Sequence, residues 1–368
     1  MITLDGSYGE GGGALVRVAL ALSALTGKEF SVKNIRAGRE QSGLKAQHVT
    51  AVNALKEICQ AKTNEIGIGS TELSFTPGRV KSGIYTIDIG TAGSISLLLQ
   101  ALILPCLFAP NKVTLNVIGG TCGKGQASVD YLQNVFLPYV QRFVNRIELK
   151  VWKRGYYPKG QGKISLEINP KLKLKEKMDL STFYEEIGLK AIKIKLIEPG
   201  QLEQIKGIVN VSAELQDKEV GERIKKSAEN ALKECNISVS IRAEYSKTES
   251  VGGEIVLWAL WSKEGKIDPD NPVIMGSDAL VEVGKSSEQV GKEAAEKLKQ
   301  EIKSGFPVDM HLGDQLIPFL ALLPGSEIKT REISPHAQTN MYVVEKFLPI
   351  GFKVDKNTIS TELREKDL

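Results

Sequence analysis

The feature that most constrains the fold is a repeated order of predicted elements along the chain. In each copy, an aspartate near the end of a short strand precedes a polar or glycine-containing turn and an apolar helix. A second strand, a second helix and two short strands then follow. The three aspartates are Asp5, Asp88 and Asp309. Copies of such a unit can bury each other's sheet faces, so the sequence predicts an α/β (α+β) protein with three repeated βαβαββ units in one large domain.

A stretch of different character separates the second copy from the third. It follows a charged linker at 171–177 and carries its own alternating strands and amphipathic helices. Strands are predicted at 190–197, 207–215, 237–245 and 253–261, and helices at 218–235 and 286–305. We therefore expect a smaller α/β domain inserted at 181–306, with 1–180 and 307–368 forming the large domain.

The composition is that of an ordinary globular protein, with 42% hydrophobic and 25% charged residues and a net charge of +4. The slight positive charge permits an anionic partner such as RNA without demanding one. The four cysteines form no CxxC pair, which argues against a zinc site or a disulfide framework. The apolar run 94–109 is shorter than the roughly 20 residues that a membrane span needs. With no signal peptide in evidence, a cytoplasmic location and no membrane partner are expected.

Two of the three histidines lie at predicted helix starts in 307–340. Ser334 is a plausible cap and Pro335 suits the first helical position, which places His336 in the first turn as a candidate nucleophile or base. His311 lies at the start of the preceding helix, close to Asp314 and Gln315, which are candidate ligand contacts because exposed N–H groups at helix starts suit phosphate oxygens. The alternative is that these side chains only cap helices or face solvent.

The glycine run 9–13 contains one acid, Glu10, and ends at a helix start. Its glycines would let the backbone approach a phosphate, and Glu10 could hold a divalent cation. The run matches neither the Rossmann nor the P-loop pattern, so a tight strand-to-helix turn is the alternative interpretation.

The loop 36–48 places Arg36, Arg39 and His48 near one helix start, where the arginines could grip a phosphate. A solvated basic loop is the alternative. Gln100 lies in an otherwise apolar helix and must hydrogen-bond either a ligand or a neighbouring backbone group.

Two further segments could contact a ligand. The loop 119–126 could close over a nucleotide, although a surface loop is the simpler interpretation. The segment 153–163 mixes lysines and Arg154 with two tyrosines, a combination that can hold phosphates and stack on bases, but it could equally be a long hairpin tip.

Together these residues resemble the RNA 3′-terminal phosphate cyclase family, in its archaeal type. The match covers most of the chain, and the order and spacing of several long motifs make a chance match improbable. The motifs are LDGSYGEGGG (4–13), GLKAQH (43–48), TAGSISLLLQ (91–100), DYLQNVFLP (130–138), RGYYPKGQG (154–162), HLGDQLIPFLAL (311–322) and EISPHAQTN (332–340).

The resemblance implies a large domain of three repeats with a thioredoxin-like insert. It also implies an enzyme, a phosphorus–oxygen ligase in RNA processing that uses ATP and a divalent cation, Mg²⁺ or Mn²⁺, to convert an RNA 3′-phosphate end into a 2′,3′-cyclic phosphate. The reaction would pass through a covalent histidine–AMP and an RNA-adenylate. The implied nucleophile is His336 and the implied metal contact is Glu10. The implied nucleotide contacts are Gln100, His311, Leu312, Gly313, Asp314 and Gln315, and the implied RNA and phosphate contacts are Arg17, Arg36, Arg39 and His48.

The chain departs from the family pattern at two places. Ala14 stands where relatives often have glutamine, so a polar contact is absent there. The loop TCGKGQASVD (121–130) replaces a more aromatic version, which puts in doubt a contact from that loop to the adenine or metal.

Two other functions compete with the enzyme. A non-catalytic relative that acts as a ribosome-assembly factor would lack the nucleophilic histidine, and His336 is present. A carboxyvinyl transferase of the shikimate pathway shares the repeated unit but not the pairing of the two helix-start motifs. The RNA substrates, the preferred nucleotide and metal, the role of the insert and the oligomeric state, a homo-oligomer included, are left open by the sequence.

Overall fold

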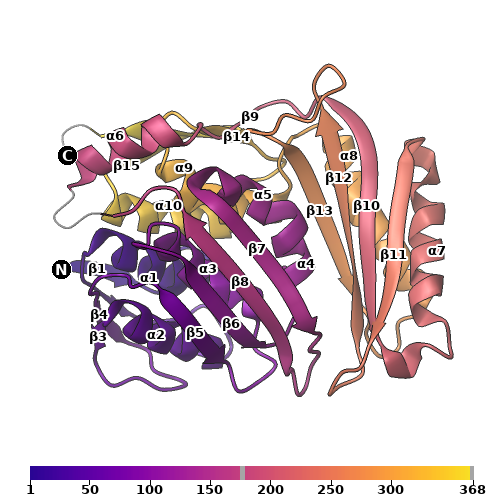
Figure 1. Cartoon of the computed structure of the whole chain (residues 1–368), viewed down its shortest axis with the longest axis horizontal. Coiled ribbons are helices and arrows are strands. Elements are labelled where there is room, and N and C mark those ends of the chain that lie inside the picture. The colour runs from indigo at the N-terminus through magenta and orange to yellow at the C-terminus, as the bar shows by residue number, and fades with distance from the viewer. Residues whose placement is uncertain (175–178, 365–368) are drawn as a thin grey trace.

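The computed structural model describes residues 1–174 and 179–364 and confirms a mixed α/β fold (Figure 1). Within these residues the strands form four sheets of four strands each. The predicted linker at 171–177 lies partly outside the described residues. None of the helices described in this part of the chain has both the length and the apolar character needed to cross a bilayer.

The first sheet has the order β1-β2-β4-β3 and carries the two helices expected from the sequence. β1 is parallel to β2, whereas β4 is antiparallel to both β2 and β3. Of the two short strands that close the unit, the first would be expected in the alternating stretch 65–69, but it lies at Lys62–Thr63 instead. The elements are β1 (Ile2–Asp5), α1 (Ala14–Thr26), β2 (Phe30–Lys33), α2 (Ala46–Cys59), β3 (Lys62–Thr63) and β4 (Leu73–Thr76).

The second sheet, β5-β6-β8-β7, repeats this pairing, with β5 parallel to β6 and the remaining pairs antiparallel. The sequence pattern of 129–144 favours one continuous helix, but the structure breaks it by a π-helical segment at Leu132–Phe136. Pro138 follows this segment and has no N–H to continue the regular ladder. The elements are β5 (Gly83–Asp88), α3 (Ile95–Cys106), β6 (Val113–Gly119), α4 (Val129–Tyr131), α5 (Leu137–Val140), β7 (Val144–Lys153) and β8 (Gly162–Pro170).

The third sheet, β9-β14-β16-β15, has the same pairing again, but its first strand is interrupted. β9 pairs with Glu327 and Ile328, and a parallel bridge from Val308 to Thr330 continues along the same edge. The chain thus leaves this edge after Leu196 and returns to it at Val308. The elements are α6 (Leu180–Lys190), β9 (Lys195–Leu196), α9 (Met310–Ala321), β14 (Glu327–Lys329), α10 (Pro335–Phe347), β15 (Ile350–Asp355) and β16 (Thr358–Leu363).

The fourth sheet, β11-β10-β12-β13, is formed by the part of the chain between Leu196 and Val308 and stands at the right of Figure 1. α7 and α8 pack on its strands. β13, at Val273–Leu280, was missed by the sequence prediction; a Cβ on its Gly276 would lie 2.5 Å from the Tyr131 ring, so this strand packs tightly on the second unit. The elements are β10 (Gln201–Ser212), α7 (Val220–Leu232), β11 (Ser238–Ser246), β12 (Gly253–Ser262), β13 and α8 (Ser287–Ser304).

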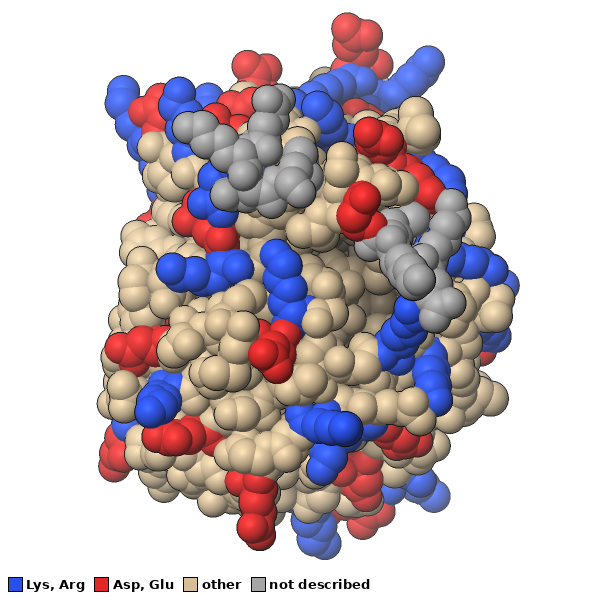
Figure 2. Space-filling view, turned by 90° about the vertical axis from the view of Figure 1, so that its left-hand side faces the viewer, with Lys and Arg blue, Asp and Glu red and all other residues tan. Residues whose placement is uncertain are grey.

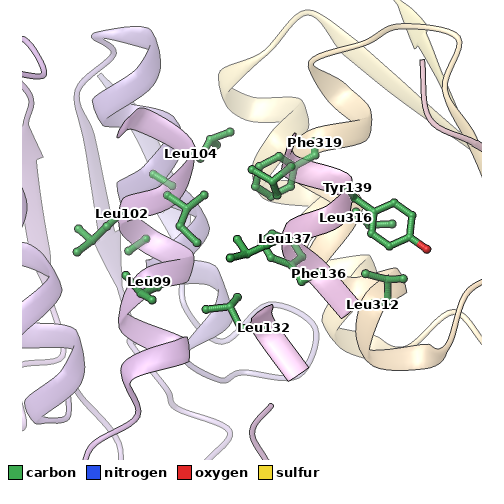
Figure 3. Packing of buried hydrophobic residues seen from close by; sticks show 14 of the residues in the cluster. Leu99, Leu102, Leu104, Leu132, Phe136, Leu137, Tyr139, Leu312, Leu316 and Phe319 are labelled. Carbon is green, nitrogen blue, oxygen red and sulfur yellow. The ribbon is translucent and has the colours of Figure 1, made fainter. Parts of the chain in front are cut away.

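The apolar helices meet in the centre of the molecule. Figure 3 shows buried leucines along α3, with Leu132, Phe136 and Leu137 to one side of this helix and Leu316 and Phe319 of α9 beyond them. Fully burying a side chain of this size stabilises the folded protein by about 1.5–3 kcal/mol. The face shown in Figure 2 mixes Lys and Arg with Asp and Glu instead of gathering one sign of charge. Charge is thus dispersed over the face that Figure 2 shows. The core of Figure 3, by contrast, joins helices that belong to different sheets.

Candidate active site

The start of α10 has the local structure that its sequence predicts. The hydroxyl of Ser334 caps the helix by accepting a hydrogen bond from the Ala337 N–H at 3.0 Å, and Pro335 occupies the first turn. Ser334 also donates a hydrogen bond to the carboxylate of Asp314 in α9. The cap thus fixes the first turn of α10 against α9, and His336 extends from that turn with 44% of its side chain exposed.

His336 lies beside a carboxylate and an arginine from distant parts of the chain. Its Nδ1 atom is 3.0 Å from Oε1 of Glu10, and the other oxygen of Glu10 accepts a hydrogen bond from Arg39. Glu10 itself is nearly buried. The structure therefore brings the glycine run, the basic loop and the first turn of α10 to one place.

The glycine run approaches α10 closely because its glycines lack side chains. Gly9 has φ +63°, and a Cβ there would lie 2.3 Å from the hydroxyl oxygen of Thr339, one turn along from His336. Any larger residue at Gly9 would be both strained and in collision. Tyr8 stacks on Tyr342 one turn further along the helix, with ring centroids 3.9 Å apart. The run and the helix are thus matched antiparallel, which sets Glu10 opposite His336.

This pairing shifts the pKa values of both partners. The neighbouring Glu10 raises the pKa of His336 above its ordinary 6.5, although burial opposes the shift. Burial acts to raise the pKa of Glu10, but hydrogen bonding and the charges of His336 and Arg39 outweigh it and lower that pKa. The carboxylate is therefore ionised near neutral pH, and a proton on Nδ1 of His336 is stabilised by it. That arrangement leaves Nε2 of the ring as the atom available for bonding.

A second group of polar side chains lies buried behind the glycine run. Arg17 of α1 donates from Nε to the side-chain oxygen of Gln100 in α3, at 2.9 Å. His48 is 2% exposed and accepts a hydrogen bond from the Lys45 N–H at Nδ1, so its proton is on Nε2. That Nε2 atom has no protein partner, and a Cβ on Gly13 would lie 2.4 Å from it. A buried donor without an acceptor beside Gly13 is suited to a ligand oxygen.

The pKa values in this buried group also follow from burial. Burial and the nearby cations lower the pKa of His48 to about 3, so the ring is neutral. Burial lowers the pKa of Arg17 to about 10, which leaves it charged near neutral pH.

Arg36 differs from its neighbour Arg39 in what it contacts. It is buried and donates to the carbonyl oxygens of Gln41 and Gly43, at 2.7 and 3.0 Å. Arg36 therefore shapes the basic loop from within, whereas the half-exposed Arg39 faces Glu10.

A cavity of about 350 Å³ opens beside His336. Its walls are helices α1, α3, α9 and α10 and the loop around Gln126. These elements belong to the parts of the chain that form the first, second and third sheets. Its polar lining includes Arg17, Gln100, His311, Asp314, Gln315 and His336. Its apolar lining includes Leu97, Ile103, Leu104, Phe136, Pro318 and Phe319. A mostly apolar cavity with a few convergent polar groups is typical of a small-molecule site.

The five residues of the HLGDQ motif, 311–315, lie in the first turns of α9 and point to different sides of it. His311, Asp314 and Gln315 face the cavity, and burial raises the pKa of Asp314 to about 6. Leu312 is fully buried in the core, and its N–H is bonded to the side chain of Asp309. The N–H of Gly313 is bonded to the Asp309 carbonyl oxygen. Neither Leu312 nor Gly313 lines the cavity, because in an α-helix they point away from the face that the other three share.

Sequence reasoning missed the apolar wall, since leucines and phenylalanines of a cavity look like ordinary core residues. It also favoured a surface loop at 119–126, whereas Gly125 and Gln126 line the cavity. The basic segment 153–163 divides between two roles. Arg154 is buried in an ion pair with Asp130, while Tyr157 at the hairpin tip is 82% exposed. The nearest sequence signal for the wall was the spacing of α3 and α9 residues on one helical face.

No group of three or more His, Cys, Asp and Glu side chains is arranged to hold a metal ion within residues 1–174 and 179–364. Glu10 is the carboxylate that contacts His336, and it also contacts Arg39. A single carboxylate together with substrate phosphates is, however, a common way to bind Mg²⁺.

The fold and the site together define an α/β protein in which a histidine, a carboxyl group and an arginine border a cavity of about 350 Å³. Comparison with known proteins identifies the group to which it belongs. The family model described as RNA 3′-terminal phosphate cyclase matches residues 8–354, so the chain belongs to that family.

Curated relatives agree with this assignment over nearly their whole length. An RNA 3′-terminal phosphate cyclase of Methanopyrus kandleri is 41% identical, covering 96% of this chain and 95% of the relative. Proteins of the same name from Archaeoglobus fulgidus and Pyrococcus abyssi are each 40% identical, with coverage of 98% and 96% of this chain and 99% and 95% of the relatives.

Proposed function

We propose that this protein is an ATP-dependent RNA 3′-terminal phosphate cyclase that works through a covalent histidine–AMP. The observation that carries the proposal is the 3.0 Å contact between Nδ1 of His336 and Glu10, at the mouth of the cavity. A non-catalytic RNA-binding factor would not require a histidine so oriented by a buried carboxylate. Family membership supports the same activity.

In the first step, Nε2 of His336 attacks the α-phosphorus of ATP. A P–N bond forms, the bond from the α-phosphorus to its bridging oxygen breaks, and pyrophosphate leaves with that electron pair. The proton on Nδ1 stays in place, and the Glu10 carboxylate compensates the positive charge that the ring acquires.

In the second step, an oxygen of the RNA 3′-phosphate attacks the phosphorus of the histidine-bound AMP. The P–N bond breaks, its electron pair returns to Nε2, and the RNA carries a phosphoanhydride to AMP. In the third step, the 2′-oxygen attacks the RNA phosphorus, loses its proton to solvent or a base, and expels AMP. A phosphate monoester is a poor electrophile, so adenylation supplies the leaving group that cyclisation requires.

The cavity would hold the adenosine part of ATP. Since Oε1 of Gln100 accepts from Arg17, its amide N–H₂ group is available to a ring nitrogen or hydroxyl of the nucleotide. Asp314 and Gln315 line the cavity on the α9 side. Leu312 and Gly313 do not line the cavity, so they would affect the nucleotide only indirectly, by setting the position of α9.

Arg39, Arg17 and the Nε2–H of His48 are proposed to bind phosphate oxygens, and Arg36 to hold the loop that carries Arg39. A divalent cation would screen the charge of the triphosphate, with Glu10 as its protein ligand and phosphate oxygens as the others. We also propose that the protein is cytoplasmic.

We further propose that the first three sheets are copies of one unit and that the fourth belongs to an inserted domain. The shared pairing pattern of the three sheets supports the repeat. The insert is proposed to begin after Leu196 rather than at 181, because β9 pairs with β14 and the Tyr184 hydroxyl bonds to the Ala321 carbonyl oxygen.

The test is conversion of a short oligoribonucleotide that ends in a labelled 3′-phosphate. With ATP and Mg²⁺, the label is expected to become resistant to phosphatase and the product to lose one water in mass. A label that remains sensitive to phosphatase, with folded protein and several RNA sequences, would favour the binding factor.

A further inference from the structure

An exposed aromatic ring lies two residues before Glu10, the carboxylate that contacts the proposed catalytic histidine. Tyr8 is 44% exposed, although its ring is stacked on Tyr342 at 3.9 Å with only 18° between the planes. The stack covers one face of the Tyr8 ring, and the exposure that remains is large for a residue inside a tight glycine run. Tyr8 is not among the residues that line the cavity, so the proposed adenosine site gives it no role.

Tyr8 is also held in a defined position. Its N–H donates to the Asp5 carbonyl oxygen at 3.1 Å, and its own carbonyl oxygen accepts from Gly11 at 3.2 Å. Gly9, between Tyr8 and Glu10, fits closely against Thr339, which ties this part of the run to α10. A rigid aromatic platform binds a base with little loss of conformational freedom.

Two cations belong to the surroundings of this platform. The Lys346 ammonium lies 5.4 Å from the centre of the Tyr342 ring, and Arg39 contacts Glu10, two residues from Tyr8. Tyr8 and Glu10 are two residues apart, which limits their Cα separation to about 7 Å. A phosphate held by Arg39 would therefore lie within reach of a base on Tyr8.

We propose that the outer face of the Tyr8 ring stacks on the base of the 3′-terminal nucleotide of a single-stranded RNA. This inference rests on the proposed function, because it assumes that the RNA 3′-phosphate is bound between Arg39 and His336. Stacking tolerates any base, so Tyr8 would contribute affinity and alignment without sequence preference.

The experiment measures AMP transfer in a single turnover, starting from enzyme already adenylated and expressed per adenylated molecule. The acceptors are an oligoribonucleotide with a 3′-phosphate and the same strand whose last nucleotide lacks its base but keeps its 2′-hydroxyl. The wild-type protein is expected to transfer AMP about 10-fold more slowly to the abasic strand. This comparison needs no variant.

Tyr8→Leu should slow transfer to the intact strand by about the same factor and cause no further loss with the abasic strand. Tyr8→Phe should behave like the wild type, since it keeps the ring. Tyr157→Leu is the matched control, because it makes the same change at an exposed tyrosine of the β7–β8 hairpin, and it should respond to base removal as the wild type does.

Equal transfer to both strands by the wild type would overturn the inference while leaving the proposed function intact. A loss in Tyr8→Leu that multiplies with base removal would also overturn it and would make Tyr8 a clamp for the glycine run only. If the wild type forms no adenylate, or transfers none to either strand, the proposed function fails and the inference fails with it.

Discussion

His48 and His336 both lie in the first turns of helices, yet their surroundings differ completely. His48 is 2% exposed among cations, and its pKa falls to about 3. His336 is 44% exposed and faces the carboxylate of Glu10, and its pKa rises above 6.5. The same imidazole is thus a neutral donor at one helix start and, at the other, the proposed nucleophile with a carboxylate partner. Burial and charge, and not the helix start, decide the role of each ring.

The largest effect is expected from removing the ring that has the carboxylate partner. His336→Ala should reduce self-adenylation by at least about 10³-fold, because the other two histidines cannot supply the nucleophile. The fold should survive, since the side chain is half exposed. Adenylation would be measured with ATP labelled at the α-phosphate, with His311→Ala as the matched control. Retained labelling in His336→Ala would move the nucleophile to another residue.

Changing the partner should alter the pH dependence. In the wild type, adenylation should increase with pH through the raised pKa of His336, because Nε2 must be unprotonated to attack. Glu10→Gln removes the main cause of the raised pKa of His336, so the midpoint of the pH dependence of adenylation should shift to lower pH. The maximal rate should fall by about 10²-fold because the charged ring is less stabilised. A midpoint that does not change would show that Glu10 acts on the metal or the loop and not on His336.

Arg39 tests whether the basic loop serves the RNA end. Arg39→Ala should slow AMP transfer to a 3′-phosphorylated RNA by about 10–10²-fold and impair self-adenylation less, as expected for one lost phosphate donor. Both steps would be followed in single turnovers. An equal loss in both would argue against a role specific to the RNA phosphate.

The smallest effect on chemistry is expected at the buried ring. His48→Gln should slow transfer to RNA by about 10-fold while leaving its pH profile unchanged, because His48 stays neutral well below neutral pH. Its depressed pKa also affects stability: below about 6.5 the unfolded chain binds a proton that the folded chain excludes. Stability should therefore fall as pH decreases from about 6.5 towards 3, and His48→Gln should flatten that dependence in thermal unfolding. An unchanged slope would mean that the folded His48 can be protonated.

Much of the site was predictable because its signals are local. The cap at Ser334 and the order of strands and helices in the first sheet follow from residues that lie close together in sequence. The resemblance to the family also implied roles for Glu10, Arg39 and His336, and the structure brings both His336 and Arg39 into contact with Glu10.

Three features could not be predicted because they depend on packing between units. The apolar wall of the cavity is formed by α3 and α9, which meet only in the folded protein. The contact from Glu10 to His336 depends on the close fit of Gly9 against Thr339. The interruption of the third sheet after Leu196 is visible only once β9 is seen to pair with β14.

The central claim is that His336 becomes covalently adenylated, and intact-protein mass spectrometry tests it most directly. The protein would be incubated with ATP and Mg²⁺ without RNA and analysed before and after mild acid treatment. The account predicts an added AMP that mild acid removes, as expected of a P–N bond, and that is missing from His336→Ala. An unmodified mass in folded wild-type protein, or an adduct that persists in His336→Ala, would contradict it.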